Sequence, residues 1–281
     1  MNGGYAPPDM AIGVERRRQS VSVNGLDVRY FESGAGPQLI LLHGGSATND
    51  PVWDDLRWGW SAYIDDLARS FHVFAPDIRG HGATRNPAGT LTYDLLADDL
   101  MAFIAALGLE KPAVIGFSEG GIIATVVTIR DPIVLRAVVN IAGYDLFDPI
   151  SPSMERLRRF LSRNDPTAKE PDLIHIEERG GPWFDALIGS HDAMQGSGAW
   201  RKLLVDAFDH WTAPIGYGLE DLRRVSTPTL IMAGDRDPFC GPEVSIGAFR
   251  LVPDAELAII PNCVHAIVPE MVSAAKRFLT A

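Results

Sequence analysis

The first regular pattern in the chain is an alternation of apolar and polar positions, SVSVNGLDVRYFESG at 20–34. Apolar residues recur at every second position on both sides of Asn24-Gly25, and this dipeptide favours the tight turn between two antiparallel strands. The pattern therefore predicts a β-hairpin at the start of the fold.

Further along, continuous apolar runs alternate with segments of helical spacing. The runs of strand length lie at 37–45, 71–80, 112–117, 137–142, 228–233 and 256–260. The segments with a helical repeat of apolar residues lie at 52–70, 92–108, 119–130 and 268–279. Strands that alternate with helices are typical of an α/β fold, so we predict a mostly parallel sheet with helices on both faces. In the helix at 92–108, Thr92 is placed to cap the N-terminus and Gly108 to end the helix.

The alternation stops between 146 and 213. This segment is polar, holds the amphipathic stretches SMERLRRFLSR and AWRKLLVDAFDHW, and contains no good strand. We therefore predict a helical cap at 146–213, inserted into an α/β core that is formed by 19–145 and 214–281. Residues 1–18 are expected to form a flexible N-terminal tail.

Composition and charge exclude several classes of protein. With 281 residues, of which 46% are hydrophobic, the chain is long enough for one large domain with a sizeable core. Its net charge of -11 argues against binding to nucleic acid or to an anionic membrane. No apolar run approaches the roughly 18 residues of a membrane span, and the N-terminus lacks the pattern of a secretory signal. Two cysteines are too few for a disulfide framework, so we expect a reduced, cytoplasmic protein.

The stretch AVIGFSEGG at 113–121 places a serine among glycines where a strand passes into a helix. A serine hydroxyl becomes a nucleophile when a base takes its proton and hydrogen-bond donors stabilise the oxyanion. In such a bend the oxygen of Ser118 projects above the sheet, and the amide of Glu119 is placed to be an oxyanion donor. G-x-S-x-G alone occurs by chance in many proteins, but the strand–turn–helix context predicts a nucleophile here.

The ends of two later strands carry the partners that such a serine requires. The stretch TLIMAGDRDPFC ends a strand with Asp235 and Asp237, and the last strand is followed by His265. Serine, then an acid, then histidine is the chain order of this type of site, in which the carboxylate orients the imidazole base. Upstream, LLHGGS ends another strand, and the amide of Gly45 is placed to supply a second oxyanion donor.

Together these motifs resemble the serine hydrolases of the α/β-hydrolase fold, over residues 20 to 280. The motifs that carry the resemblance are HGG at 43–45, DIRGHGATR at 77–85, GFSEGG at 116–121, GDRD at 234–237 and VHA at 264–266. The resemblance implies that Ser118 is the nucleophile, His265 the base and Asp237 the acid. It also implies an oxyanion hole formed by the amides of Gly45 and Glu119.

Some assignments keep alternatives. Asp235, or Asp145 after the preceding strand, remain possible acids. Ser46 stands where many relatives have a proline, so the chain departs from the family pattern at its first loop. The side chain of Glu119 is expected to be an acid at a helix N-terminus, where the helix dipole favours it.

The other polar residues are expected to be structural. His81, in the glycine-rich RGHGATR loop, is predicted to position that loop. The histidines of the predicted cap, which have no metal-ligand spacing, are His175, His191 and His210. We therefore expect neither a metal nor a cofactor. Cys240 and Cys263 are expected to be packing thiols.

Aromatic side chains are expected to form the wall of the pocket. None of the six tryptophans lies in the predicted sheet. The residues predicted to contact the substrate are Trp53, Phe117, Trp183 and Trp211. A pocket with aromatic walls favours a substrate with an apolar body.

This site suits acyl transfer to water through an acyl-enzyme on Ser118. We therefore expect hydrolysis of a carboxylic ester or lactone of an apolar small molecule, by a monomer or homodimer. A serine nucleophile excludes the relatives that use aspartate at this position, the haloalkane dehalogenases and epoxide hydrolases. The alternatives are hydrolysis of a carbon–carbon bond, a cofactor-free perhydrolase or haloperoxidase with the same triad, and a ligand receptor with slow turnover.

Overall fold

The computed structural model describes residues 15–51, 58–148 and 152–281, and within these ranges eight strands form one sheet. The strands are β1 (Arg17–Val23), β2 (Leu26–Ser33), β3 (Gln38–Leu42), β4 (His72–Pro76), β5 (Ala113–Phe117), β6 (Ala137–Ile141), β7 (Thr229–Gly234) and β8 (Ala255–Ile260). Their order across the sheet is β1-β2-β4-β3-β5-β6-β7-β8. Strand β2 runs antiparallel to both β1 and β4, and the other neighbours are parallel. The predicted α/β fold with a mostly parallel sheet is confirmed.

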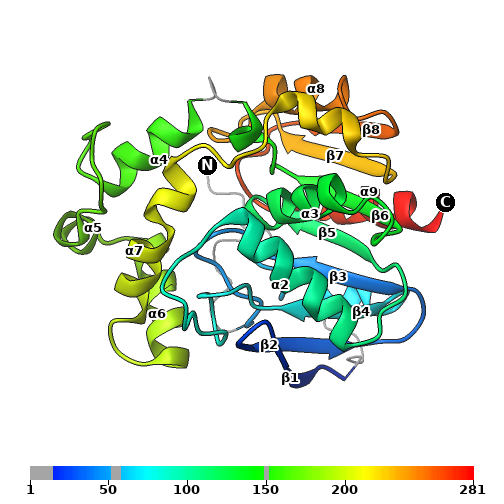
Figure 1. Cartoon of the computed structure of the whole chain (residues 1–281), viewed down its shortest axis with the longest axis horizontal. Helices are drawn as coiled ribbons and strands as arrows, with labels where there is room; N and C mark the ends of the chain where they lie inside the picture. Colours follow the sequence, from blue (N-terminus) through cyan, green and yellow to red (C-terminus); the bar gives the residue numbers. More distant parts are fainter. Residues whose placement is uncertain (1–14, 52–57, 149–151) are drawn as a thin grey trace.

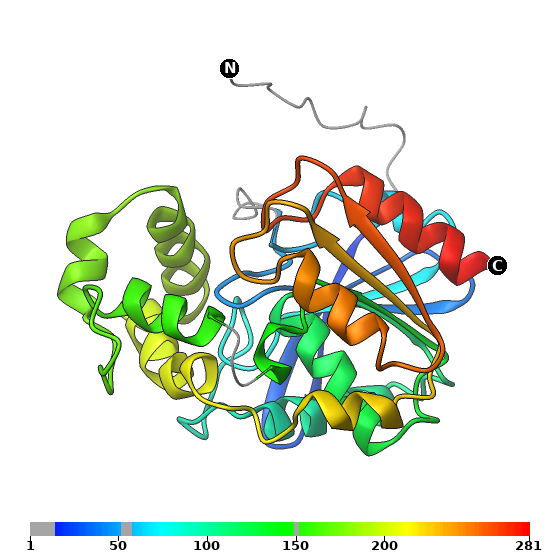
Figure 2. The ribbon, with the colours of Figure 1, turned by 90° about the horizontal axis from the view of Figure 1, so that it is seen from above.

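Helices cover both faces of this sheet. Helices α2 (Tyr93–Ala106) and α3 (Glu119–Arg130) lie on one face, and α9 (Pro269–Thr280) lies on the other (Figures 1 and 2). Helix α8 (Pro242–Phe249) packs along β7 and β8. Helix α2 has the predicted ends, because the Thr92 side chain accepts a hydrogen bond from the Leu95 amide at 3.1 Å and Gly108 follows with φ +61°.

The predicted hairpin is formed by β1 and β2, with Val23 paired to Leu26 around the Asn24-Gly25 turn. Strand β1 begins at Arg17, inside the segment 1–18 that the sequence indicates as a tail. The strand pairing extends to Arg17, which lies opposite Glu32 in the register, and the Arg17 guanidinium lies 3.1 Å from the Glu32 carboxylate. Residues 1–14 of the predicted tail lie outside the described ranges.

The prediction of a helix at 52–70 is wrong for most of the residues in this range that the structure describes. Helix α1 spans only Ile64–Leu67, and the residues just before it form turns. Backbone groups there bond to the loop after β3 instead, since the Trp60 amide donates to Asn49 Oδ1 at 3.0 Å. Residues 52–57 lie outside the described ranges.

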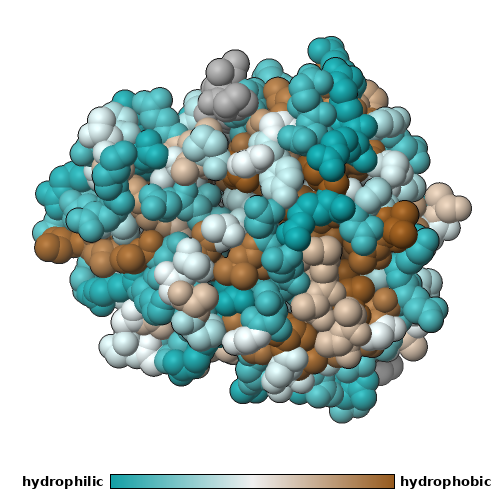
Figure 3. Space-filling view, viewed as in Figure 1, coloured by the Kyte–Doolittle hydropathy of each residue, from teal (hydrophilic) through white to brown (hydrophobic). Residues whose placement is uncertain are grey.

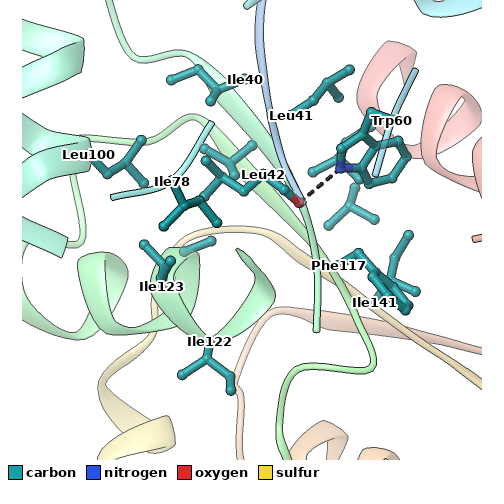
Figure 4. Packing of buried hydrophobic residues seen from close by; sticks show 14 of the residues in the cluster. Ile40, Leu41, Leu42, Trp60, Ile78, Leu100, Phe117, Ile122, Ile123 and Ile141 are labelled. Carbon is teal, nitrogen blue, oxygen red and sulfur yellow. Dashed lines mark hydrogen bonds between the residues drawn. The ribbon is translucent and has the colours of Figure 1, made fainter. Parts of the chain in front are cut away.

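The core extends on both sides of β3 (Figure 4). Ile40 and Leu42 point to the face of α2, where Leu100 lies, and Leu41 points to the opposite face, toward Trp60. Trp60 is fully buried, and its indole N–H donates to the Leu42 carbonyl oxygen at 2.8 Å. Because helices cover both faces, the strand is a continuous apolar run rather than an alternating one.

Between β6 and β7 the described residues form helices and no strand. These helices are η1 (Asp145–Phe147), α4 (Ser153–Leu161), α5 (Leu173–Arg179), α6 (Pro182–Gln195), α7 (Ala199–Thr212) and η2 (Leu219–Arg224). We call α4 to α7 the cap helices. They group beyond one end of the sheet, on the side of the molecule away from the C-terminus (Figures 1 and 2), and α7 packs against both α4 and α6.

The surface is largely polar. On the face shown in Figure 3, hydrophilic side chains predominate and hydrophobic ones lie in separate patches. The large hydrophobic side chains that are exposed are Ile133, Ile174, Val205, Phe249 and Val264. In the described part of the chain, no helix combines the length and the apolar character that crossing a bilayer requires.

Candidate active site

Ser118 occupies a sharp bend between β5 and α3. Its backbone angles, φ +50° and ψ -117°, lie outside the regions that residues with a side chain prefer. Its amide donates to the Ile141 carbonyl oxygen at 2.7 Å, and its own carbonyl oxygen accepts from the amides of Gly121 and Ile122. The sheet therefore holds one side of the bend and the helix holds the other, while the residue itself lines a cavity.

Glycines around Ser118 let the helix approach the sheet. A Cβ atom on Gly116 would lie 2.3 Å from the Gly120 carbonyl oxygen, and one on Gly120 would lie 2.5 Å from the Leu42 carbonyl oxygen. Both neighbours are backbone atoms that cannot move aside without shifting an element. The close packing of α3 on β3 and β5 therefore requires glycine at these positions.

His265, in the loop after β8, is paired with Asp237, in the loop after β7. The Nδ1–H of His265 donates to Asp237 Oδ2 at 2.7 Å. The other carboxylate oxygen accepts from the amides of Phe239 at 2.8 Å and Cys240 at 3.0 Å. This carboxylate is therefore fixed by three hydrogen bonds, and it leaves His265 with Nε2 as the ring nitrogen that is free to act as a base.

Aromatic rings surround the imidazole of His265. The centroid distances are 4.7 Å to Phe117, 5.1 Å to Phe239 and 6.0 Å to Trp58. The Trp58 indole N–H also donates to the His265 carbonyl oxygen at 2.9 Å, so the backbone and the ring are both held. Ser118 and His265 line the same cavity, although they lie far apart in the sequence.

Of the two alternative acids, Asp235 does not reach the histidine. It is exposed, and its Oδ1 accepts from the Cys263 amide at 3.1 Å, which ties the loop after β7 to the loop after β8. The structure thus brings Asp237, rather than Asp235, to the His265 ring.

The second alternative, Asp145, lies in η1 after β6 and lines the same cavity. It is buried, and this burial raises the pKa of its carboxyl to about 6, although the nearby His265 partly opposes the rise. His265 is therefore near enough to affect the ionisation of Asp145, while the hydrogen bond of the imidazole goes to Asp237.

The loop after β3 brings Gly44 and Gly45 next to Ser118. A Cβ atom on Gly44 would lie 3.5 Å from the Ser118 Cβ. His43 holds this loop, because its Nδ1–H donates to the Gly44 carbonyl oxygen at 2.8 Å and its Nε2 accepts from the Ile78 amide at 3.0 Å. Complete burial lowers the pKa of His43 to about 4, so this histidine is a neutral structural link.

The side chain of Glu119 has hydrogen-bond partners that were not predicted from the sequence. It is buried, and its Oε1 accepts from His210 Nε2 at 2.6 Å and from the Trp211 indole N–H at 2.9 Å. Both donors belong to α7, so the acid expected to serve the helix dipole also contacts the cap helices. A sequence signal existed, because α3 is apolar on all sides, and an acid in a fully buried helix requires a partner.

A cavity of about 300 Å³ lies between the sheet and the cap helices. Aromatic and aliphatic side chains form most of its wall: Trp58, Tyr93, Phe117, Ile122, Leu146, Leu157, Phe160, Leu161, Trp183, Trp211 and Phe239. The remaining lining residues are Gly44, Gly45, Ser46, Ser118, Glu119, Asp145 and His265. None of the described residues that line it is Lys or Arg.

Three of the four residues predicted to contact the substrate lie at the cavity. Phe117, Trp183 and Trp211 line the cavity, and the Trp183 indole N–H donates to Ser46 Oγ at 3.0 Å. Trp53 lies outside the described ranges. Trp58, another of the tryptophans outside the predicted sheet, lines the cavity as well. The two remaining tryptophans, Trp60 and Trp200, are buried in the protein interior.

Within the described ranges, no group of three or more His, Cys, Asp or Glu side chains is arranged to hold a metal ion. The cysteines Cys240 and Cys263 are both buried, and they do not form a disulfide. Burial raises the pKa of Cys240 well above its ordinary value, so this thiol is unreactive near neutral pH.

Comparison with known proteins adds independent information. The sequence profile of the alpha/beta hydrolase family matches residues 39–279. The chain is 30% identical over 253 residues to a 2-hydroxy-6-oxo-6-(2'-aminophenyl)hexa-2,4-dienoic acid hydrolase of Metapseudomonas resinovorans, covering 87% of this chain and 83% of that protein. It is 26% identical over 258 residues to a pimeloyl–acyl-carrier-protein methyl ester esterase of Nitrosospira multiformis, covering 84% of this chain and 90% of that protein. Among solved structures, a serine hydrolase involved in carbazole degradation, the CarC enzyme, superposes with a TM-score of 0.71 at 26% identity, covering 95% of this chain and 99% of that one.

The tight bend at Ser118 yields a stability prediction. Gly116→Ala is expected to lower the free energy of unfolding by about 3 kcal/mol or more, because the new methyl group meets backbone atoms. Gly247→Ala in α8 is the matched control, since a Cβ there has no neighbour within 4 Å, and helix propensity should stabilise it by up to about 1 kcal/mol. Urea unfolding of the two variants tests this. Equal stability of the variants would contradict the packing described here.

The buried Asp145 predicts a pH-dependent difference in stability. Because burial raises its pKa to about 6, the folded state favours the neutral carboxyl. The contribution of this carboxyl to the free energy of unfolding is fully present below its ordinary pKa of 3.8. It is lost as the pH rises through about 6, where the folded protein must ionise the buried group. Asp145→Asn stays neutral, so its free energy of unfolding should rise relative to wild type by on the order of 2 kcal/mol across this window. Denaturant unfolding at several pH values measures the difference, and parallel pH profiles would refute it.

Proposed function

Because the chain belongs to the alpha/beta hydrolase family, we propose that it is a serine hydrolase that cleaves a carboxylic ester or lactone of an uncharged, apolar small molecule. The observation that carries this proposal is the pairing of His265 with Asp237 at 2.7 Å, because His265 lines the same cavity as Ser118. These three residues come from the ends of three parallel strands, and such strand ends are where ligands bind in α/β sheets.

The reaction follows from the roles that these groups can take. The Nε2 atom of His265 accepts the proton of the Ser118 hydroxyl as the serine oxygen attacks the acyl carbon. Asp237 keeps the Nδ1 proton in place and stabilises the imidazolium that forms. His265 then gives its proton to the departing alcohol, which leaves an acyl group on Ser118. In the second half, His265 takes a proton from water as the water oxygen attacks the acyl carbon. The bond from this carbon to Ser118 Oγ then breaks, His265 returns the proton to the serine oxygen, and the acid is released.

The tetrahedral intermediates carry a negative oxygen that requires donors. As the first residue of α3, Glu119 has an amide that the helix's own hydrogen-bond ladder does not use. The second donor is the amide of Gly45, in the loop that packs next to Ser118. Fixed donors of this kind stabilise the transition state more than the substrate, so they accelerate the chemical step.

The cavity supports an uncharged substrate. Its wall is mostly aromatic and aliphatic, and the ionisable side chains among its described lining residues are His265, the phenol of Tyr93 and the acids Glu119 and Asp145, none of which is Lys or Arg. A substrate carboxylate would lose its hydration there without gaining a cationic partner. A neutral acyl chain or lactone ring loses only water-exposed apolar surface, which favours binding.

A second candidate is hydrolysis of a carbon–carbon bond. It is favoured by the relative at 30% identity, whose name is that of a 2-hydroxy-6-oxo-6-(2'-aminophenyl)hexa-2,4-dienoic acid hydrolase. The same serine, histidine and acid serve both reactions. The name of that substrate includes a carboxylic acid, however, and the described lining of the cavity in this chain offers no Lys or Arg to pair with it. We therefore rank ester or lactone hydrolysis first.

The preference for an uncharged substrate can be measured directly. The matched pair is p-nitrophenyl hexanoate and mono-p-nitrophenyl adipate, which differ by a terminal carboxylate on the acyl chain. We expect kcat/KM to be at least about tenfold higher for the neutral ester, because the carboxylate has no cation to meet. A lactone series and a 2-hydroxy-6-oxo-hexadienoate complete the panel. Faster turnover of the dienoate than of any neutral ester or lactone would establish the second candidate instead.

The choice of acid is tested by two isosteric substitutions. Asp237→Asn should lower kcat by about 10²- to 10⁴-fold, because the amide cannot hold the Nδ1 proton or stabilise the imidazolium. Asp235→Asn is the matched control, since asparagine can still accept from the Cys263 amide, and it should stay within about threefold of wild type. Both are assayed with p-nitrophenyl hexanoate at saturation. A large loss in Asp235→Asn with little loss in Asp237→Asn would reverse the assignment.

A further inference from the structure

We propose that the carboxylate of Glu119 is a positioning residue that ties cap helix α7 to both oxyanion donors, so that catalysis depends on the seating of this helix. The inference rests on the proposed serine-hydrolase function. It assigns to the side chain of Glu119 a part distinct from that of its backbone amide.

The first observation is the bond between Glu119 and α7. The carboxylate is only 2% exposed, and its Oε1 accepts from His210 Nε2 at 2.6 Å and from Trp211 Nε1 at 2.9 Å. These donors are consecutive residues near the C-terminal end of α7. The residue that follows Ser118 is therefore hydrogen-bonded to a residue of α7 that lies 91 positions further along the chain.

The second observation is that the other donor packs on the same side chains. A Cβ atom on Gly45 would lie 3.0 Å from Trp211 Cζ2 and 3.3 Å from Glu119 Oε2. The loop that carries the Gly45 amide therefore rests directly on the indole and on the carboxylate. Glu119, Trp211 and Gly45 therefore contact one another, and we call these three residues the contact set. Glu119 and Gly45 carry the two proposed oxyanion donors, and Trp211 belongs to cap helix α7.

The third observation is the electrostatic setting of this carboxylate. Burial opposes its ionisation, but the hydrogen bond from His210, the proximity of His81 and the bond from Trp211 together lower the pKa of Glu119 to about 2. His81 Nε2 lies 3.5 Å from Glu119 Oε2, and the His210 ring stacks on Tyr93 with centroids 4.0 Å apart. If the acceptor is removed, two buried N–H groups on α7 lose their partner, and the helix loses its anchor on α3.

This arrangement predicts an effect on the chemical step. Oxyanion donors act only when they are held at hydrogen-bond distance from the developing charge, and small displacements lower the rate strongly. Loosening the contact set should therefore lower kcat while KM changes little, because the donors bind the transition state more tightly than the substrate. A side chain that merely stabilised the fold would lower the fraction of active molecules, but not the kcat of those that remain active.

The test compares Glu119→Ala with Glu119→Gln in the full-length protein, using p-nitrophenyl hexanoate and counting active sites by end-point reaction with a fluorophosphonate. Per titrated site, Glu119→Ala should lose about 10- to 100-fold in kcat, with KM within about threefold of wild type. Glu119→Gln should restore kcat to within about threefold, since its amide oxygen still accepts from His210 and Trp211. Glu270→Ala, an exposed acid in the first turn of α9, is the control for the helix-dipole effect and should leave kcat unchanged.

Each outcome decides the proposal. A kcat per titrated site that is unchanged in Glu119→Ala overturns it, and so does an equal loss in Glu119→Gln, which would show that charge and not position matters. If Glu119→Ala does not fold, Trp211→Phe takes its place, because it removes one donor and keeps a ring: a several-fold loss of kcat per site supports the inference, and no loss overturns it. A wild-type protein that takes up no fluorophosphonate refutes the serine-hydrolase function itself, which separates that failure from a failure of this inference.

Discussion

The site depends on one steric constraint, the close approach of α3 to the ends of β3 and β5. This approach is possible because Gly116 and Gly120 present no side chain to each other or to Leu42, and it forces Ser118 into a backbone conformation with φ +50°. The bend directs Ser118 to the cavity and makes Glu119 the first residue of a helix. The proposed nucleophile, one proposed oxyanion donor and the carboxylate bonded to α7 therefore all depend on the same turn. Such local strain persists only because the surrounding core determines it.

A layer of buried polar groups connects this turn to the loops and the cap helices. His43 holds the loop of Gly45, Asp237 holds the ring of His265, and Glu119 holds α7. Each of these groups is largely removed from water and has found partners, as a buried polar side chain must. The cavity next to them is lined mostly by aromatic and aliphatic side chains, and none of its described lining residues is Lys or Arg. In the proposed mechanism the triad supplies the chemistry, and this lining would determine which substrates bind.

Sequence reasoning predicted the parts that depend on local patterns. The alternation of strands and helices indicated the sheet, and the glycines around Ser118 together with the order Ser118, Asp237, His265 placed the candidate residues at strand ends. The prediction failed at 58–63, where the apolar residues have helical spacing but the Trp60 amide donates a hydrogen bond to Asn49 Oδ1. It also missed the bond from Glu119 to His210, since a contact between residues so distant in the chain leaves no periodic signal. Apolar spacing reports burial, whereas the partner of a buried polar group depends on the tertiary fold.

The central claim is that Ser118 is a nucleophile activated by His265. The most direct measurement is the intact mass of the protein after treatment with a fluorophosphonate, for the wild type and for the Ser118→Ala and His265→Ala variants. The account predicts a single phosphonyl adduct on the wild type and none on either variant within the same time, with all three proteins folded. An adduct that persists in Ser118→Ala, or a folded wild type that forms none, would contradict it.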